Sequence, residues 1–150
     1  MNFVCMGLEP LSEVYPNLWV GSQESLGSDL RSKGFRSLVL CAKEIQPQAA
    51  QFPGVPVFRC PFEDDPTKQL NDLEKRMIRE ASSFVAREIQ SNRPVLVTCH
   101  AGINRSALVS ALALTEIGFT AKDAVDQIRA GRDAVCLNNP IFLDFLGASR

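Results

Sequence analysis

The sequence predicts an α/β fold. Short runs of β-branched and apolar residues alternate along the chain with longer segments of helical periodicity, and only brief turns separate them. The chain has 150 residues, of which 45% are hydrophobic and 22% charged, and this suits one domain with a single core. It contains no internal repeat and no low-complexity linker. One domain over residues 1–150 is therefore expected.

The strand candidates are short apolar runs bounded by turn residues. The first two flank a turn at Pro16-Asn17, and the last precedes the segment with the strongest functional signal. The predicted strands are Glu13–Tyr15, Leu18–Val20, Ser37–Cys41, Val57–Cys60 and Val95–Thr98.

The helix candidates have apolar residues at helical spacing and recognisable ends. Gly34 closes the first, Gly118 ends the third, and Thr120 with Asp123 resembles a capping box before the fourth. Asn139 followed by Pro140 is typical of an N-cap and first helical residue. The predicted helices are Ser28–Lys33, Leu70–Gln90, Arg105–Ile117, Ala121–Ala130 and a last one from Pro140 through Leu146. The third is apolar on every face, so it should be central.

A short loop between the last strand and the third helix indicates a phosphate cradle. The loop begins with Cys99 and ends with Arg105 and Ser106 at the start of the helix, and Gly102 stands where the backbone must approach a ligand. Backbone N–H groups entering a helix N-terminus converge on an anion, and the helix dipole adds about half a unit of positive charge. The same field favours the thiolate form of Cys99, which is the nucleophilic form.

Arg105 suits two tasks in such a loop. Its planar fork can bind two phosphoryl oxygens, and it can stabilise the charge of a phosphoryl-transfer transition state. The alternative is an inert, buried Cys99 at a strand end with a surface arginine beyond it. The matching strand, loop and helix context favours the functional interpretation.

Residues 99–106, Cys-His-Ala-Gly-Ile-Asn-Arg-Ser, resemble the signature loop of the cysteine-dependent protein tyrosine phosphatases, and specifically of their dual-specificity branch. Three further segments are similar to motifs of that family, so the resemblance spans nearly the whole chain: Tyr15–Ser22, Cys60–Asp64 and Asn139–Phe142. The resemblance implies a mixed sheet of about five strands with helices on both faces. One departure is Thr98, which stands where the family usually has histidine and could partly replace it by hydrogen bonding to the loop.

The resemblance also assigns roles. Asp64 matches the family's general acid, with Asp65 as the alternative and Asp72 as the next candidate. Ser106 would donate a hydrogen bond to the sulfur of Cys99, and Asn139 would brace the signature loop as well as cap a helix. The residues expected to contact the phosphate are His100, Ala101, Gly102, Ile103, Asn104 and Arg105.

The activity expected from this resemblance is hydrolysis of phosphate monoesters on proteins, at phosphotyrosine and phosphoserine or phosphothreonine, through a phosphocysteine. A related phosphatase of lipid, nucleotide or RNA phosphates is an alternative, although the loop has no lysine and the net charge is −1. A rhodanese-like sulfurtransferase is a further alternative, but its chemistry needs neither the hydroxyl of Ser106 nor the acidic turn that carries Asp64. A phosphopeptide-binding pseudophosphatase would normally lack the cysteine, arginine or acid, and all three are present.

The remaining composition predicts a cytoplasmic protein without cofactor or metal. The five cysteines are an odd number without metal-ligand spacing, which indicates a reducing compartment. Met1–Cys5 lacks the features of a signal peptide or myristoylation site, and Cys5 is a redox partner for Cys99 only if the N-terminus folds back. His100 should border the pocket rather than form a protease dyad, and three cysteines should lie in the core: Cys41, Cys60 and Cys136. The expected partner is a phosphorylated protein, not nucleic acid or a membrane; oligomeric state is left open.

Overall fold

The computed structural model describes residues 8–147 and contains one five-stranded sheet. The sequence-based statements about Cys5 and the first five residues lie outside this range. Across the sheet the strand order is β1-β2-β5-β3-β4. In chain order the strands are β1 (Leu11–Tyr15), β2 (Leu18–Gly21), β3 (Ser37–Ala42), β4 (Val57–Phe62) and β5 (Val95–Thr98). All five predicted strands are present, and β1 and β4 each extend two residues beyond the predicted bounds.

The sheet is mixed, as expected. β1 and β2 form an antiparallel hairpin around Asn17, which takes a positive φ of 70°, whereas β2, β5, β3 and β4 pair in parallel. β5 is central, with Val97 opposite Val20 on one side and Val39 on the other. Because the carboxyl ends of parallel strands meet at one edge of a sheet, the segments that follow β3, β4 and β5 lie together there.

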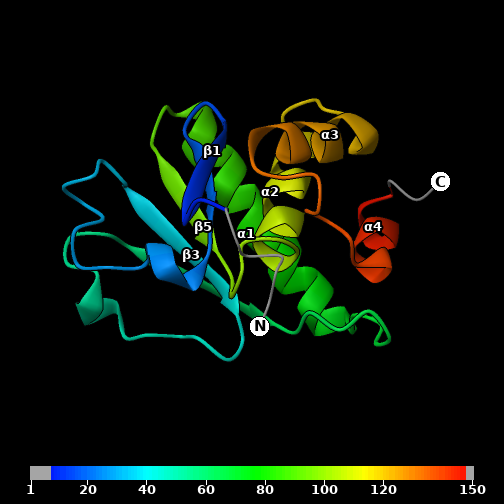
Figure 1. Cartoon of the computed structure of the whole chain (residues 1–150), viewed down its shortest axis with the longest axis horizontal. Coiled ribbons are helices and arrows are strands. Elements are labelled where there is room, and N and C mark those ends of the chain that lie inside the picture. The colour runs from blue at the N-terminus through cyan, green and yellow to red at the C-terminus, as the bar shows by residue number, and fades with distance from the viewer. Residues whose placement is uncertain (1–7, 148–150) are drawn as a thin grey trace.

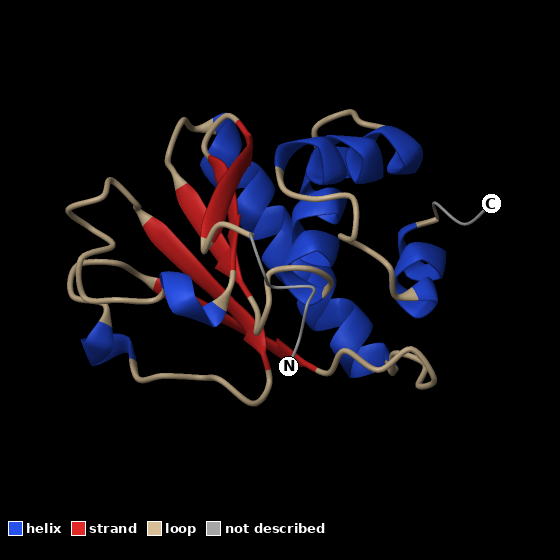
Figure 2. Ribbon diagram, viewed as in Figure 1, coloured by secondary structure: helices blue, strands red, loops and turns tan. Residues whose placement is uncertain are grey.

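The described α-helices cover one face of the sheet (Figures 1 and 2). Their core includes Leu108 and Val109 of the central helix, which are fully buried. The helices are α1 (Asp72–Gln90), α2 (Arg105–Glu116), α3 (Ala121–Gly131) and α4 (Pro140–Leu146). None of the helices within residues 8–147 is both long and apolar enough to cross a bilayer.

Helices were expected on both faces of the sheet, and within residues 8–147 those on the opposite face are short 3-10 helices joined by turns, not α-helices. Leu30, Phe35, Phe52 and Val55 pack there against the other side of the strands, beside η2 (Gln23–Ser25) and η3 (Ala49–Gln51). The expected helix Ser28–Lys33 is wrong, because this segment forms consecutive turns. Its backbone makes one bond of helical spacing, from Lys33 N to Asp29 O, before Gly34 turns away at a φ of 101°.

The helix ends follow the capping pattern of the sequence. α1 begins at Asp72 rather than at Leu70, because Asn71 caps it and forms a capping box with Glu74. Thr120 accepts from Asp123 N at the start of α3, and Asn139 accepts from Ile141 N at the start of α4. The cap at Asn139 fixes a helix N-terminus close to the carboxyl edge of the parallel strands, whereas the start of α3 lies beside Tyr15 at the opposite edge.

Candidate active site

The signature loop, residues 99–105, connects the central strand β5 to α2 at the carboxyl edge of the sheet. Donors outside the loop bind its carbonyl groups. Gln23 N donates to His100 O at 3.0 Å and Leu137 N to Ile103 O at 2.9 Å. The guanidinium of Arg132 donates to the two carbonyls between them, those of Ala101 at 3.2 Å and Gly102 at 2.6 Å. Four successive carbonyls are thereby held against the surrounding protein.

The amide groups of the loop point the other way. N–H and C=O point in opposite directions across a planar trans peptide, so carbonyls bound outside the loop direct the next amides toward its centre. Within residues 8–147, the N–H groups of residues 100–104 have no hydrogen-bond acceptor. Gly102 completes the curve with a φ of 68°, and a Cβ there would lie 2.7 Å from the backbone carbon of Gly21. The result is a ring of free donors suited to an oxyanion.

Cys99 lies at the foot of this ring, with its side chain buried. Its Sγ is 3.2 Å from the Oγ of Ser106, which is itself fully buried in the first turn of α2. A hydroxyl at this distance donates to a thiolate, so the contact stabilises negative charge on the sulfur. The structure therefore brings Cys99 and Ser106 together as the sequence predicts.

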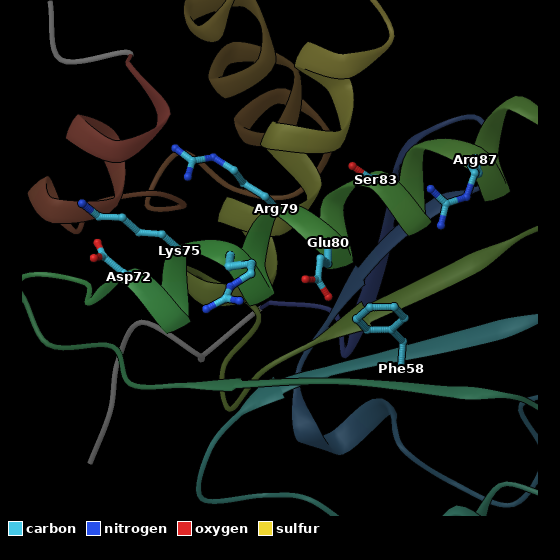
Figure 3. A pocket seen from close by; sticks show the side chains of 8 residues that line it. Phe58, Asp72, Lys75, Arg79, Glu80, Ser83 and Arg87 are labelled. Atoms are coloured by element: carbon cyan, nitrogen blue, oxygen red, sulfur yellow. The ribbon is translucent and has the colours of Figure 1, made fainter.

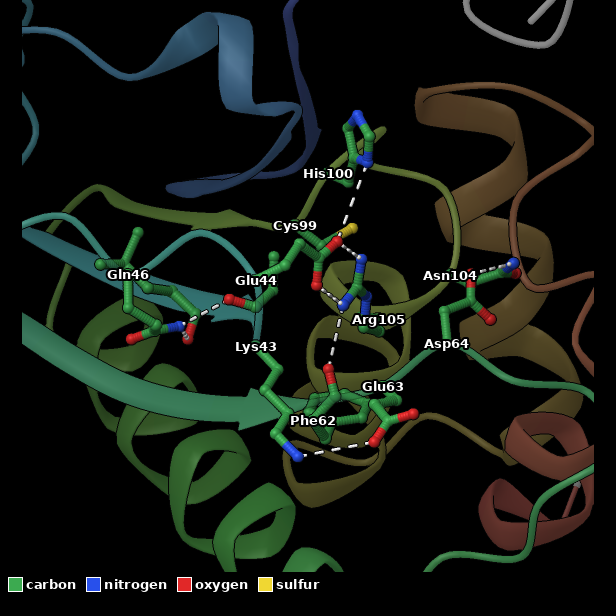
Figure 4. A network of polar contacts seen from close by, with 12 residues as sticks. Lys43, Glu44, Gln46, Phe62, Glu63, Asp64, Cys99, His100, Asn104 and Arg105 are labelled. Atoms are coloured by element: carbon green, nitrogen blue, oxygen red, sulfur yellow. Dashed lines mark hydrogen bonds and ion pairs between the residues drawn. The ribbon is translucent and has the colours of Figure 1, made fainter.

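Arg105 is also buried and uses only one edge of its guanidinium within the protein (Figure 4). Nη1 and Nη2 donate to the two carboxylate oxygens of Glu44 at 2.7 and 2.8 Å, and Nη1 also donates to Phe62 O at 3.0 Å. Nε is buried and has no hydrogen-bond partner among residues 8–147. A guanidinium carries five N–H groups, so the edge formed by Nε and the second hydrogen of Nη2 stays available for two phosphoryl oxygens.

Glu44 is the functional residue that sequence reasoning missed. It follows β3 as Cys99 follows β5, and the shared edge of the two parallel strands was the signal that could have found it. The hydrogen bonds from Arg105 lower the pKa of Glu44 from 4.5 to about 2, so the pair is charged at neutral pH. The Nδ1 of His100 lies 3.8 Å from the same carboxylate. Arg132, which holds the loop carbonyls, was also missed and has no local sequence signal.

The acid loop, residues 63–71, joins β4 to α1 and carries Asp64 into the site. Both carboxylate oxygens of Asp64 accept amide hydrogens, from Nδ2 of Asn139 at 2.8 Å and from Nδ2 of Asn104 at 2.9 Å. The amide orientations are fixed, because Asn104 Oδ1 accepts from Asn138 N and Asn139 Oδ1 accepts from Ile141 N. Asn139 thus contacts Asp64 as well as capping α4. It also braces the signature loop, since its own N–H donates to Asn104 Oδ1 at 3.3 Å.

The other two acid candidates point elsewhere. Asp65 accepts from both the backbone N–H and the hydroxyl of Thr67, which lowers its pKa and holds it in a local turn. Asp72 is the first residue of α1 and lines a separate surface groove. Of the three, the structure places only Asp64 in the pocket with Cys99.

The pocket above the loop has a volume of about 320 Å³. His100 lies at its border with a side chain that is 59% exposed, in agreement with the sequence-based expectation. The remaining lining residues are Glu44, Asp64, Cys99, Ala101, Ile103, Asn104 and Arg105. A pocket with one arginine and two carboxylates suits a single phosphoryl group better than a polyphosphate.

The structure corrects the expectation for Thr98 and confirms the expected burial of three cysteines. The hydroxyl of Thr98 donates to Val39 O at 3.3 Å, across the sheet, so its expected hydrogen bond to the loop is wrong. Cys41, Cys60 and Cys136 are fully buried, as expected. Burial and a hydrogen bond with Cys60 raise the pKa of Cys41 well above its usual value, and burial raises the pKa of Cys136 to about 11. A raised pKa disfavours the thiolate form of Cys41 and Cys136, and burial shields all three thiols from solvent.

Comparison with protein-family models matches residues 18–146 to the catalytic domain of dual specificity phosphatases. This chain belongs to the dual specificity phosphatase family. The structure resembles human DUSP28 with a TM-score of 0.79 and 27% identity, covering 93% of this chain and 91% of that one. It resembles a mouse putative dual specificity phosphatase, solved with zinc tungstate, with a TM-score of 0.78 and 26% identity, covering 92% and 84%. A sequence comparison with curated proteins gave no match.

The family membership confirms the resemblance stated from the sequence and supports phosphatase activity. The fold is shared more widely. A human tyrosine phosphatase-like serine/threonine/tyrosine-interacting protein superposes with a TM-score of 0.72 at 22% identity, covering 93% of this chain and 94% of that one. At this identity the likeness shows the fold alone. The activity of this chain therefore has to be argued from its own site.

Proposed function

We propose that this protein hydrolyses phosphate monoesters on phosphotyrosine and phosphoserine or phosphothreonine proteins through a phosphocysteine. The observation that carries the proposal is the ring of unpaired loop amides, with the thiol of Cys99 at its foot and the free edge of Arg105 beside it. Every element of this ring donates hydrogen bonds or carries positive charge, which suits the oxyanion of a phosphoryl group. A merely structural loop would leave fewer buried donors unsatisfied.

In the first step the thiolate of Cys99 attacks phosphorus and the bond to the leaving oxygen breaks. Arg105 and the loop amides bind the equatorial oxygens, and Asp64 gives its proton to the leaving oxygen. Asn104 and Asn139 orient the carboxyl group of Asp64 for this transfer. Each carboxyl oxygen keeps a second acceptor site beside its amide contact, so these contacts are compatible with both protonation states.

In the second step water attacks the phosphorus of the phosphocysteine, and the carboxylate of Asp64 takes its proton. The sulfur–phosphorus bond breaks and returns a thiolate, which the hydroxyl of Ser106 stabilises from 3.2 Å. Phosphate leaves, and Asp64 is protonated again for the next cycle. Glu44 accepts hydrogen bonds from Nη1 and Nη2 of Arg105 and so holds the guanidinium in place during both half-reactions.

The test compares wild type with Cys99→Ser on an aryl phosphate and on phosphotyrosine and phosphoserine peptides. We expect Cys99→Ser to abolish turnover and to keep binding phosphate or vanadate, because the loop amides and Arg105 persist. If the wild-type protein hydrolyses the aryl phosphate but neither peptide, the proposed class of protein substrates is contradicted. Activity retained in Cys99→Ser would contradict the mechanism.

The cytoplasmic location and the absence of nucleic-acid and membrane partners are part of the same proposal. They rest on the net charge of −1 and on the cysteine content of the sequence. A fluorescent fusion seen outside the cytoplasm would contradict the location.

A further inference from the structure

A surface groove of about 640 Å³ runs along the outer face of α1, outside the active-site pocket (Figure 3). Its helical wall extends from Asp72 at the N-terminus of α1 to Arg87 near the C-terminus, and Phe58 of β4 borders it on the sheet side. The acid loop leads directly into the end of the groove at Asp72. A chain lying in this groove would therefore continue toward the segment that carries Asp64.

The groove is basic, although the whole chain has a net charge of −1. Four cationic side chains line it: Lys75, Arg76, Arg79 and Arg87. Within residues 8–147 none of the four takes part in an ion pair. Arg79 instead stacks over the ring of Phe145 at 4.7 Å. Unpaired cations gathered on one face form an attractive potential for an anion.

The carboxylates of α1 do not cancel this charge. Glu74 is used in the capping box, and Glu88 is buried and paired with Arg93 at 2.7 Å. Asp72 and Glu80 do line the groove and leave it with a surplus of positive charge. Their presence disfavours a surface of dense phosphates, such as a nucleic acid, because they would repel it at two points.

The groove also has an apolar part. Phe58 belongs to an edge strand, is half-buried and stacks on Phe84 of α1 with ring centroids 5.0 Å apart. An aromatic side chain beside unpaired arginines suits a peptide with both acidic and apolar residues.

We propose that this groove binds an acidic segment of the phosphoprotein substrate, and so sets which phosphoproteins the enzyme prefers. The proposal rests on the phosphatase function proposed above and adds a substrate class to it. Carboxylates of the segment pair with Arg76 and Arg87, while an apolar residue packs on Phe58. The contact holds the substrate near the acid loop and leaves the chemistry at Cys99 unchanged, so it acts on KM rather than on kcat.

The test uses the double variant Arg76→Glu with Arg87→Glu, because both side chains are exposed and unpaired. The control is Lys33→Glu with Arg36→Glu, which reverses two exposed charges before β3, away from the groove; Arg36→Glu alone is the matched single variant, because Lys33 pairs with Asp29 at 3.4 Å. The substrates are two phosphotyrosine peptides that differ only in an acidic or a neutral extension. We expect the groove variant to raise KM for the acidic peptide about tenfold, with kcat and aryl phosphate hydrolysis unchanged.

A binding measurement separates failure of this proposal from failure of the phosphatase function. An acidic, phosphate-free fluorescent peptide is titrated into the Cys99→Ser protein with and without the groove substitutions. Binding that weakens with the groove substitutions and with added salt supports the docking site, whether or not the enzyme turns over. Equal binding by groove and control variants would overturn it. Groove-dependent binding to phosphatidylserine vesicles, without binding of the peptide, would also overturn it.

Discussion

The signature loop and the acid loop meet in one pocket, but they are held there by different kinds of contact. Outside donors anchor the signature loop through its main-chain carbonyls, at His100 and Ile103 among others. The acid loop delivers Asp64, which is held by the side-chain amides of Asn104 and Asn139. The signature loop, a cradle held through its main chain, tolerates many side chains. The side-chain clamp on Asp64 depends on the identity of Asn104 and Asn139. The two regions should therefore respond differently to substitution.

The largest effect is expected in the side-chain clamp. Asp64→Asn removes the proton donor and places an amide where Asn104 and Asn139 already donate, so hydrolysis of a poor leaving group should slow by about 10²–10⁴-fold. An ester with a good leaving group needs no proton and should be much less affected. Steady-state kinetics across a series of aryl phosphates measures the difference.

Asp65→Asn is the matched control, because Asp65 is engaged with Thr67 and not with the pocket. The assignment of the acid would be wrong if Asp65→Asn reproduced the dependence on leaving group and Asp64→Asn did not.

Arg105→Lys tests the cradle. Lysine keeps the positive charge but has neither the edge that binds two phosphoryl oxygens nor the geometry that pairs with Glu44, so kcat/KM should fall by about 10²–10³-fold. Binding of phosphate should weaken less, because the loop amides remain. A variant within about threefold of wild type would show that Arg105 does not act on the transition state.

Glu44→Gln should have the smallest effect of the three. It removes the charge that orients Arg105 but leaves the edge at Nε intact, so we expect kcat/KM to fall by about tenfold to a hundredfold. Glu63→Gln is the control, because the Glu63 side chain is 44% exposed and, within residues 8–147, its ion pairs are with Lys43 and Lys68. Equal effects of the two substitutions on kcat/KM would show that Glu44 has no specific role in the site.

The same pair gives a prediction about stability and pH. The pKa of Glu44 is lowered from 4.5 to about 2 in the folded state, so its contribution is present above pH 4.5 and is lost as pH falls toward 2. The difference in unfolding free energy between wild type and Glu44→Gln should therefore shrink over this range. Chemical denaturation at several pH values measures it, and a difference that grows on acidification would contradict the ion pair.

The contrast between the two regions also explains what could be predicted from the sequence. The strands, the central helix and the signature loop follow from local patterns, because a strand, Gly102 and a helix N-terminus determine the loop together. Asn139 could be predicted as a cap for the same local reason. Ser28–Lys33 failed because a six-residue pattern is too short to hold a helix without tertiary support.

The contacts that orient the chemistry could not be predicted in this way. Glu44 reaches Arg105 from the end of a different strand, and Arg132 reaches the loop from the end of α3. Such pairs depend on the order of strands in the sheet and on helix packing, which single-sequence periodicity does not give. The resemblance favoured Asp64 over Asp65, but the contacts of Asn104 and Asn139 with its carboxylate have no signal in the sequence.

The phosphocysteine itself is the most direct test of this account. Ser106→Ala removes the hydroxyl that stabilises the departing thiolate, so it should slow the second step more than the first and let the intermediate accumulate. The measurement is acid quench of Ser106→Ala during turnover of a phosphorus-labelled aryl phosphate, followed by peptide mass spectrometry. We predict one phosphate on the peptide containing Cys99, and none when Cys99 is also replaced by serine. Turnover without label at Cys99, or with label on another residue, would contradict the mechanism.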